Sequence, residues 1–149
     1  MPIQNASGSF NIGLDCTIVV QHPSAPNGQV TVPNITEFKL KQDVTSLKSL
    51  RMDGVNLTAK LPLGWSGSFM ADRGGPGVDD LFALIEAAFY ASGTVLPATI
   101  TQTIHEVSGS TSTWQLIGVS MSFSDAGDWK GDAIVKQAVE FEAFRRLRV

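Results

Sequence analysis

The sequence is poor in the residues that bind metals and form disulfides. It has one cysteine, Cys16, and two histidines in 149 residues. A single cysteine cannot form an internal disulfide, which fits synthesis in a reducing compartment. No pair of His or Cys residues has the spacing of a metal site. No run approaches the roughly 18 consecutive apolar residues that a membrane-spanning helix needs. We therefore expect no metal, no cofactor and no membrane insertion.

Charge is sparse as well. Charged residues make up 17% of the chain, and the net charge is −3. Apart from RRLR near the C-terminus, the basic residues are not concentrated in one stripe, which argues against a nucleic-acid-binding surface. The N-terminal MPIQNASGSFNIG has neither a basic start nor an apolar core, so we expect no secretory signal. The length predicts one mildly acidic domain over 1–149.

What the sequence does have is period-two alternation of apolar and polar residues, which is typical of strands with one buried face. It predicts a mainly β fold, an antiparallel β-sandwich or barrel. Residues 36–61 are predicted to form a long projecting β-hairpin with an elaborate tip. The remaining predicted strands are IGLDCTIVV (12–20), GWSGSFMADR (64–73), PATITQTIHEV (97–107), TSTWQLIGVSMSF (111–123) and a closing strand from Val135.

One flanking α-helix is predicted over about residues 77–91. Leu81, Leu84, Ile85 and Phe89 recur at helical spacing. Two aspartates stand in the first turn, where carboxylates favour the helix dipole, and Gly93 is placed as a C-terminal stop.

The chain offers no convergent set of catalytic groups, and we predict that it is not an enzyme. His105 beside Glu106 is expected to be a solvent-side strand residue, and His22 lies in a Pro-rich loop. GWSGS lacks the spacing of a nucleophile elbow. RGGPG lacks the Lys-Ser/Thr ending of a P-loop and favours a tight turn. The Asp125, Asp128 and Asp132 cluster does not follow the spacing of a calcium-binding loop and is typical of turns.

The hairpin tip is the first feature that indicates assembly. Its large apolar residues alternate with charged ones, and together they would be exposed unless another molecule covers them. Open sheet edges also favour pairing with a neighbouring chain. The residues that we predict to make this contact are Val44, Leu47, Lys48, Leu50, Arg51, Met52 and Asp53.

The closing strand has one apolar face and one charged face. The apolar face is predicted to hold Val135, Val139, Phe141, Ala143 and Leu147, with Gln137 among them. The charged face is predicted to hold Lys136, Glu140, Glu142, Arg146 and Arg148.

The order of these features resembles that of bacteriophage tail tube proteins, in particular the compact single-domain form of contractile tails. The resemblance covers nearly the whole chain. The stretch GWSGSFMADRGGPGVDDLFALIEAAF and the turn DAGDWKGD before VKQAVEFEAFRRLRV carry most of it. Related tubes occur in tail-like bacteriocins and in type VI secretion.

The resemblance implies a structural virion protein, assembled in the host cytoplasm, that forms the inner tube of the tail. Six copies would form a ring whose inner sheets join around a channel, and rings would stack through the long hairpin. The implied partners are other copies of this chain, a sheath protein, a tape-measure protein and baseplate or terminator proteins. Double-stranded DNA would pass without specific binding.

Within that resemblance, Lys136, Glu140 and Glu142 are our candidates for the channel lining. A negative bias there would repel DNA phosphates. The polar faces of residues 37–43 or 99–105 are equally open alternatives. Two other functions also remain open: a small β-sandwich that binds a ligand through its loops, and another tail component of the same fold, such as a terminator or baseplate protein.

Overall fold

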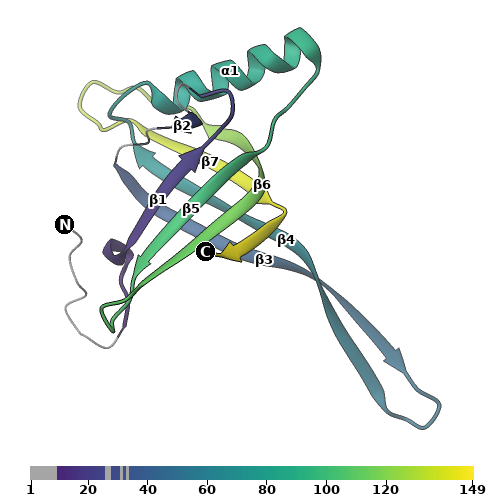
Figure 1. Cartoon of the computed structure of the whole chain (residues 1–149). Helices are drawn as coiled ribbons and strands as arrows, with labels where there is room; N and C mark the ends of the chain where they lie inside the picture. The colour runs from purple at the N-terminus through teal and green to yellow at the C-terminus, as the bar shows by residue number, and fades with distance from the viewer. Residues whose placement is uncertain (1–9, 26–27, 31, 33) are drawn as a thin grey trace.

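The computed structural model describes residues 10–25, 28–30, 32 and 34–149. Residues 1–9, on which most of the expectation about a secretory signal rests, lie outside the described residues. Within the described part, one α-helix and eight strands form an antiparallel architecture (Figure 1), and the predicted fold class is confirmed. The elements are η1 (Gly13–Asp15), β1 (Cys16–Gln21), β2 (Gln29–Val30), β3 (Ile35–Leu50), β4 (Asn56–Asp72), α1 (Gly77–Ser92), β5 (Ala98–His105), β6 (Thr111–Asp125), β7 (Lys136–Ala143) and β8 (Arg145–Arg148).

The strands form a continuous sheet that folds over on itself. Its order is β2-β1-β5-β6-β7-β4-β3, and β8 pairs with β6 off this path. The first part of β6 pairs with β5 and β8, while its second part, from Ser120, pairs with β7. Gly118 lies at this change of partners with a φ of 63°, where glycine allows the strand to bend. We call β2, β1, β5, β8 and the first part of β6 the first sheet. The second sheet comprises β3, β4, β7 and the rest of β6.

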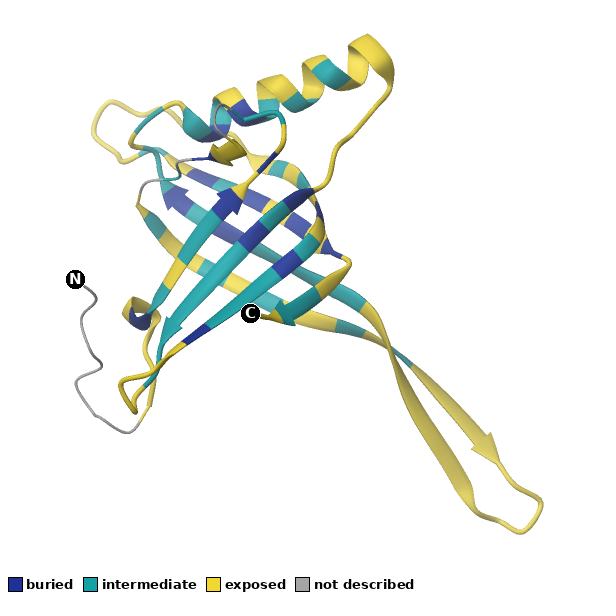
Figure 2. Ribbon diagram, in the orientation of Figure 1, coloured by how far each residue is buried: buried dark blue, intermediate teal, exposed yellow. Residues whose placement is uncertain are grey.

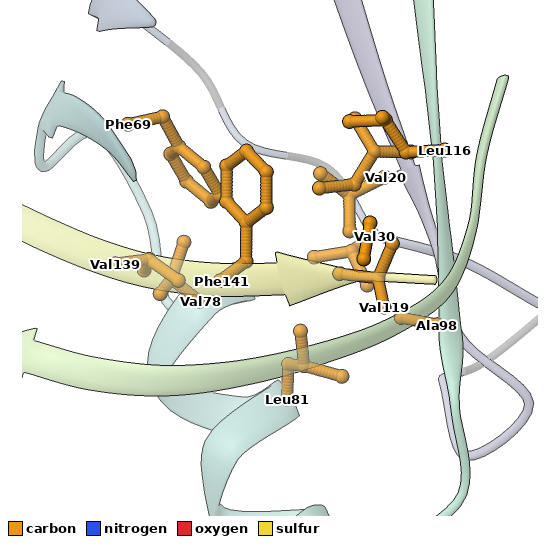
Figure 3. Packing of buried hydrophobic residues seen from close by; sticks show 12 residues of the cluster. Val20, Val30, Phe69, Val78, Leu81, Ala98, Leu116, Val119, Val139 and Phe141 are labelled. Carbon is orange, nitrogen blue, oxygen red and sulfur yellow. The ribbon is translucent and has the colours of Figure 1, made fainter. Parts of the chain in front are cut away.

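The core lies between the two sheets and against the helix, which contributes Leu81 (Figure 3). Phe69, Val139 and Phe141 enter it from the second sheet. Phe38 stacks on Phe141 with ring centroids 5.6 Å apart, and Phe82 of the helix stacks on a β6 phenylalanine at 4.7 Å. The other buried apolar members are Val20, Val30, Ile100, Leu116, Val119, Ala98, Ala143, Val78 and Leu81. Burial of each large side chain contributes about 1.5–3 kcal/mol.

The helix α1 matches the predicted range of about 77–91. Gly93 ends it in the left-handed conformation, with φ 70°, and donates its N–H to the carbonyl of Phe89 at 2.7 Å. Arg73 holds the other end through two contacts of 2.9 Å to Asp79. None of the helices in the described residues is long and apolar enough to cross a bilayer.

Two local expectations differ from the structure. The first strand begins at Cys16, not at residue 12, because a 3-10 turn over Gly13–Asp15 precedes it. In this turn a carboxylate oxygen of Asp15 accepts the N–H of Ile12 at 2.9 Å. Within this turn Asp15 is buried and Leu14 is exposed. The hairpin tip is also simpler than expected, since β3 and β4 stay paired as far as Leu50 and Asn56.

Candidate functional site

The long hairpin forms an arm that leaves the body of the protein. β4 pairs with β7 only from Trp65 onward, so residues 44–63 form a ribbon of two strands, and no third strand of the described residues pairs with it (Figure 1). We call residues 44–63 the arm. Its turn is closed by Arg51, whose N–H donates to Val55 at 2.9 Å, and by Gly54 at φ 85°. Arg51 also forms an ion pair with Asp53 at 3.0 Å.

The arm has two chemically different faces, because cross-strand partners share a face. Register places Leu47 opposite Ala59, Thr45 opposite Leu61, and Ser49 opposite Leu57. This apolar face is uncharged, and Leu47, Leu57 and Leu61 are each about half exposed. The opposite face carries Lys48 and Lys60 together with Val44, Leu50, Ser46, Asn56, Thr58 and Pro62. In Figure 2 the distal arm is exposed throughout.

The predicted tip residues therefore divide among three places. Leu47 lies on the apolar face, and Val44, Lys48 and Leu50 lie on the basic face. Arg51, Met52 and Asp53 form the turn, where Met52 is fully exposed. Sequence reasoning missed Leu57 and Leu61 as contact candidates. The alternation of 55–63 predicts that Leu57 and Leu61 share one side of the second strand of the hairpin, but the cross-strand register places them on the face of Leu47.

A bulge at the root of the arm sets its direction. Asp43 pairs with Gly64 but Val44 pairs with Pro62, so Leu63 is an extra residue in β4. Gly64 has a φ of 114°, and a Cβ added to it would lie 2.7 Å from the carbonyl oxygen of Ala143. Such a bulge increases the local twist and bends the strand. The ribbon thus turns away from the second sheet at this point.

The second surface of interest is the outward face of the second sheet. Register aligns Lys41, Ser66, Glu142 and Ser120 in one row across the four strands. The adjacent row contains Lys39, Ser68, Glu140 and Ser122. We call these eight residues the polar face. They line a shallow open groove of about 730 Å³.

The three candidate channel residues lie on one side of β7. Glu140 and Glu142 lie on the polar face, and Lys136 lies on the same side of β7, opposite Asp72. The polar sides of 37–43 and 136–142 belong to one surface, so two of the three alternatives coincide. Residues 99–105 belong to the first sheet.

The polar face carries charges of both signs. Two lysines and two glutamates belong to it. In each row a serine of β4 lies between the lysine of β3 and the glutamate of β7. Lysine and glutamate positions in one row are therefore about 10 Å apart, twice the strand spacing. Among the described residues, Glu140 and Glu142 form no ion pair, and Lys39 pairs with Glu37 at 3.0 Å. Glu37 and Asp43 add two carboxylates on the same side of β3, and the expected negative bias of the channel stays a prediction.

Arg146 was assigned to the wrong face. The chain bends at Phe144 between β7 and β8, which resets the alternation. Arg146 lies over the rings of Trp114 at 4.1 Å and Trp65 at 5.4 Å, and donates to the side chain of Gln102 at 3.1 Å. Burial lowers the pKa of its guanidinium, which nevertheless stays charged at neutral pH. Arg146 thus ties the C-terminal strand to both sheets.

The aspartates at the start of the helix and in the turn before β7 have structural partners. Asp79 at the start of the helix is held by Arg73 and accepts from Gln137 at 2.9 Å. Asp125 accepts the N–H of Gly127 at 2.9 Å, as in a turn. Among the described residues, no group of three or more His, Cys, Asp or Glu side chains is placed to hold a metal ion.

His22 is a buried side chain whose two ring nitrogens both have backbone partners. Its Nδ1 accepts the N–H of Ser24 at 3.0 Å, and its Nε2 lies 3.2 Å from the carbonyl of Leu96. Burial lowers the pKa of His22 below its ordinary value of 6.5, although the Leu96 carbonyl opposes this. His22 is therefore a neutral packing residue that joins the loop after β1 to the segment before β5.

This burial predicts a dependence of stability on pH. The unfolded chain takes up a proton on His22 more readily than the folded chain does, so the free energy of unfolding should fall as the pH drops below about 6.5. Urea unfolding at pH 7.5 and 5.5 measures the difference. His22→Gln, which keeps a donor for Leu96, should reduce it, and His105→Gln is the matched control. An undiminished pH difference in His22→Gln would assign the effect to other groups.

Solved structures with related folds match nearly the whole chain. A chain in the cryo-EM structure of the anti-feeding prophage cap, the AFP tube-terminating cap, gives a TM-score of 0.60 at 14% identity, covering 89% of this chain and 87% of that chain. A chain in the PVC sheath-tube complex of an extracellular contractile injection system, in the extended state, gives 0.57 at 13% identity, covering 99% of both. The SPP1 tail tube gives 0.59 at 12% identity, covering 92% of this chain and 77% of that chain.

The chain has a tail-tube fold. Tube, terminating-cap and baseplate structures all contain chains with this fold. At these identities the likeness concerns the fold, and it does not distinguish among the three roles. No protein-family model matches the sequence, and no curated protein matches it.

Proposed function

We propose that this chain is a structural, non-enzymatic subunit of a tail tube, and that its copies form stacked rings around a channel. The arm is the observation that carries the proposal. It extends a ribbon of two strands away from the body, with half-exposed leucines on one face. A ribbon with so little burial gains little stability by itself. A second molecule that covers the leucines supplies the missing contact.

The hexameric ring follows from the resemblance to tail tube proteins. The same resemblance implies the remaining partners, which are sheath, tape-measure and baseplate or terminator proteins of a phage tail or a related injection particle. A chain in a sheath-tube complex that matches over 99% of both chains supports this assignment. One domain over 1–149 suffices for the role.

The polar face is the surface that we assign to the channel. Its serines alternate with charges of both signs, and the carboxylates of Glu37 and Asp43 lie beside its lysines, so the surface offers passing DNA no net attraction. A hydroxyl-rich wall whose lysines lie next to carboxylates allows a polyanion to slide, because it provides no cluster of unpaired cations to bind phosphates. Lys136 extends the same side of β7 beyond the two rows.

Reversing the two glutamates tests the channel assignment. Glu140→Lys with Glu142→Lys changes the polar face from two positive and two negative charges to four positive charges. We expect assembled tubes to retain double-stranded DNA in a salt-dependent manner, because cations bind phosphates with counterion release. Glu140→Gln with Glu142→Gln is the isosteric control. Retention is measured by co-sedimentation of DNA entering through open tube ends, and variant tubes that retain no more DNA than wild type would remove these residues from the channel.

A terminating cap is the second candidate, and the match to the AFP tube-terminating cap favours it. A cap ends after one ring, whereas a tube subunit adds rings without limit. Sedimentation velocity across a concentration series separates the two, since a cap reaches a plateau mass and a tube subunit does not. A monomer at every concentration that binds a small ligand would favour the β-sandwich binding module instead.

A further inference from the structure

Helix α1 carries a second exposed apolar surface, at the end of the molecule opposite to the arm (Figures 1 and 2). Phe89 follows Ile85 by four residues on the core-facing side of the helix, yet it is 48% exposed. It forms an edge contact with Tyr90 at 5.5 Å, and Tyr90 is 77% exposed. Val95 and Leu96 follow the helix and are also exposed. We call Phe89, Tyr90, Val95 and Leu96 the helix-end surface.

The charges around the helix-end surface are opposite to those of the arm. Residues 87–105 contain no Asp, Glu, Lys or Arg, and no Lys or Arg occurs between Arg73 and Lys130. In the last three turns of the helix the one charged residue is Glu86, which is exposed and precedes Phe89 by three residues. On the arm, Lys48 and Lys60 have no ion-pair partner among the described residues. An apolar surface near one carboxylate thus lies at one end of the molecule, and a ribbon with an apolar face and a lysine-bearing face lies at the other.

The position of these surfaces decides what kind of contact they can make. Because they lie at opposite ends of the molecule, one copy cannot bring its own arm to its own helix (Figure 1). In a contact between two copies, one copy contributes its arm and the other its helix-end surface. The first copy keeps its helix-end surface free, and the second keeps its arm free. Such a head-to-tail contact repeats from copy to copy. It therefore generates the stacking direction that a tube requires.

We propose that the helix-end surface receives the apolar face of the arm from a copy in the adjacent ring. The leucines of the arm pack on Phe89 and Tyr90. Lys48 and Lys60 project from the other face of the arm, so their charge acts on the approach of the two copies at long range and not within the contact. The inference rests on the proposed function, because it names the acceptor surface for the arm within a stack of rings.

Cysteine cross-linking tests the proximity directly. In a Cys16→Ser background, which keeps an acceptor for Gln102, Leu57→Cys and Tyr90→Cys are made in separate chains and mixed under assembly conditions. A short bismaleimide should give a cross-linked dimer from the mixture and not from either variant alone. Thr58→Cys, on the other face of the arm, is the matched control for Leu57→Cys and should cross-link to Tyr90→Cys much less.

A substitution tests the energetic role of the same surface. Tyr90→Asp should raise the critical concentration for assembly at least tenfold, because it places a carboxylate where the leucines of the arm pack. Ala83→Asp introduces the same charge on an exposed helix position outside the helix-end surface and should leave the critical concentration within about twofold. Circular dichroism melts establish that both variants fold.

The outcomes separate the inference from the function on which it rests. Wild-type tubes that form while Tyr90→Cys fails to cross-link to Leu57→Cys would overturn the acceptor surface and leave the tube function intact. Tyr90→Asp assembling like wild type would overturn it as well. Wild-type protein that never assembles, with or without a tail initiator, would overturn the tube function itself.

Discussion

Replacing Leu47 and Leu57 together with aspartate is expected to abolish stacking without unfolding the subunit. Both side chains are on the apolar face of the arm and are about half exposed in the monomer, so the fold should change by less than about 0.5 kcal/mol. In a stack, each lost leucine removes about 1 kcal/mol of burial. An unpaired buried carboxylate costs several kcal/mol more. A total above about 3 kcal/mol raises the critical concentration more than about a hundredfold.

The control for this experiment uses the other face of the same ribbon. Ser46→Asp with Thr58→Asp adds the same two carboxylates at neighbouring positions on the basic face. We expect this pair to weaken assembly much less. Pelleting assays give the critical concentration, and thermal melts establish folding. If the leucine variant forms long tubes at wild-type concentrations, the apolar face is not the stacking contact.

The largest expected loss of stability comes from adding one methyl group at Gly67. A Cβ at this position would overlap the carbonyl oxygen of Lys39 and lie 2.8 Å from the ring of Phe141. Neither neighbour can withdraw, because Lys39 is paired within β3–β4 and Phe141 is buried between the sheets. We expect Gly67→Ala to cost about 1–3 kcal/mol or more, as overpacking does. For a chain of this length that corresponds to a fall in melting temperature of roughly 3–10 °C.

Gly75→Ala is the matched control, because nothing lies within 4 Å of the added Cβ and its backbone is not left-handed. Its melting temperature should change little. Differential scanning calorimetry of the two variants measures both effects. Equal melting temperatures for Gly67→Ala and wild type would mean that β3 and β4 are not packed as closely as the structure places them.

The local patterns of the sequence predicted most of the elements. The hairpin, the helix ending at Gly93 and the face of β7 that carries Glu140 and Glu142 all follow from periodicity over uninterrupted stretches. Periodicity describes each strand separately, however. It did not reveal that residues 37–43 and 136–142 share one face, since strand order depends on contacts distant in the sequence.

The errors occur where the alternation is interrupted. A 3-10 turn before β1 buries Asp15, and a bend at Phe144 places Arg146 against two tryptophans. At Phe144 one irregular residue shifts the following side chains to the opposite face, whereas after the 3-10 turn Ile18 and Val20 still pack toward the core. Gly64 and Gly118, both with positive φ, lie close to the Ala143–Phe144 bend. Glycines of this kind are a sequence signal that a strand changes direction.

The central claim is that this chain builds a tube by adding rings through its arm. Negative-stain electron microscopy of the purified protein across a concentration series tests it most directly, with a tail initiator added where the protein alone stays small. The account predicts rings at low concentration and hollow tubes of one diameter at high concentration, with six subunits in each ring. Discrete single rings that never stack, or small particles at every concentration with the initiator present, would contradict it.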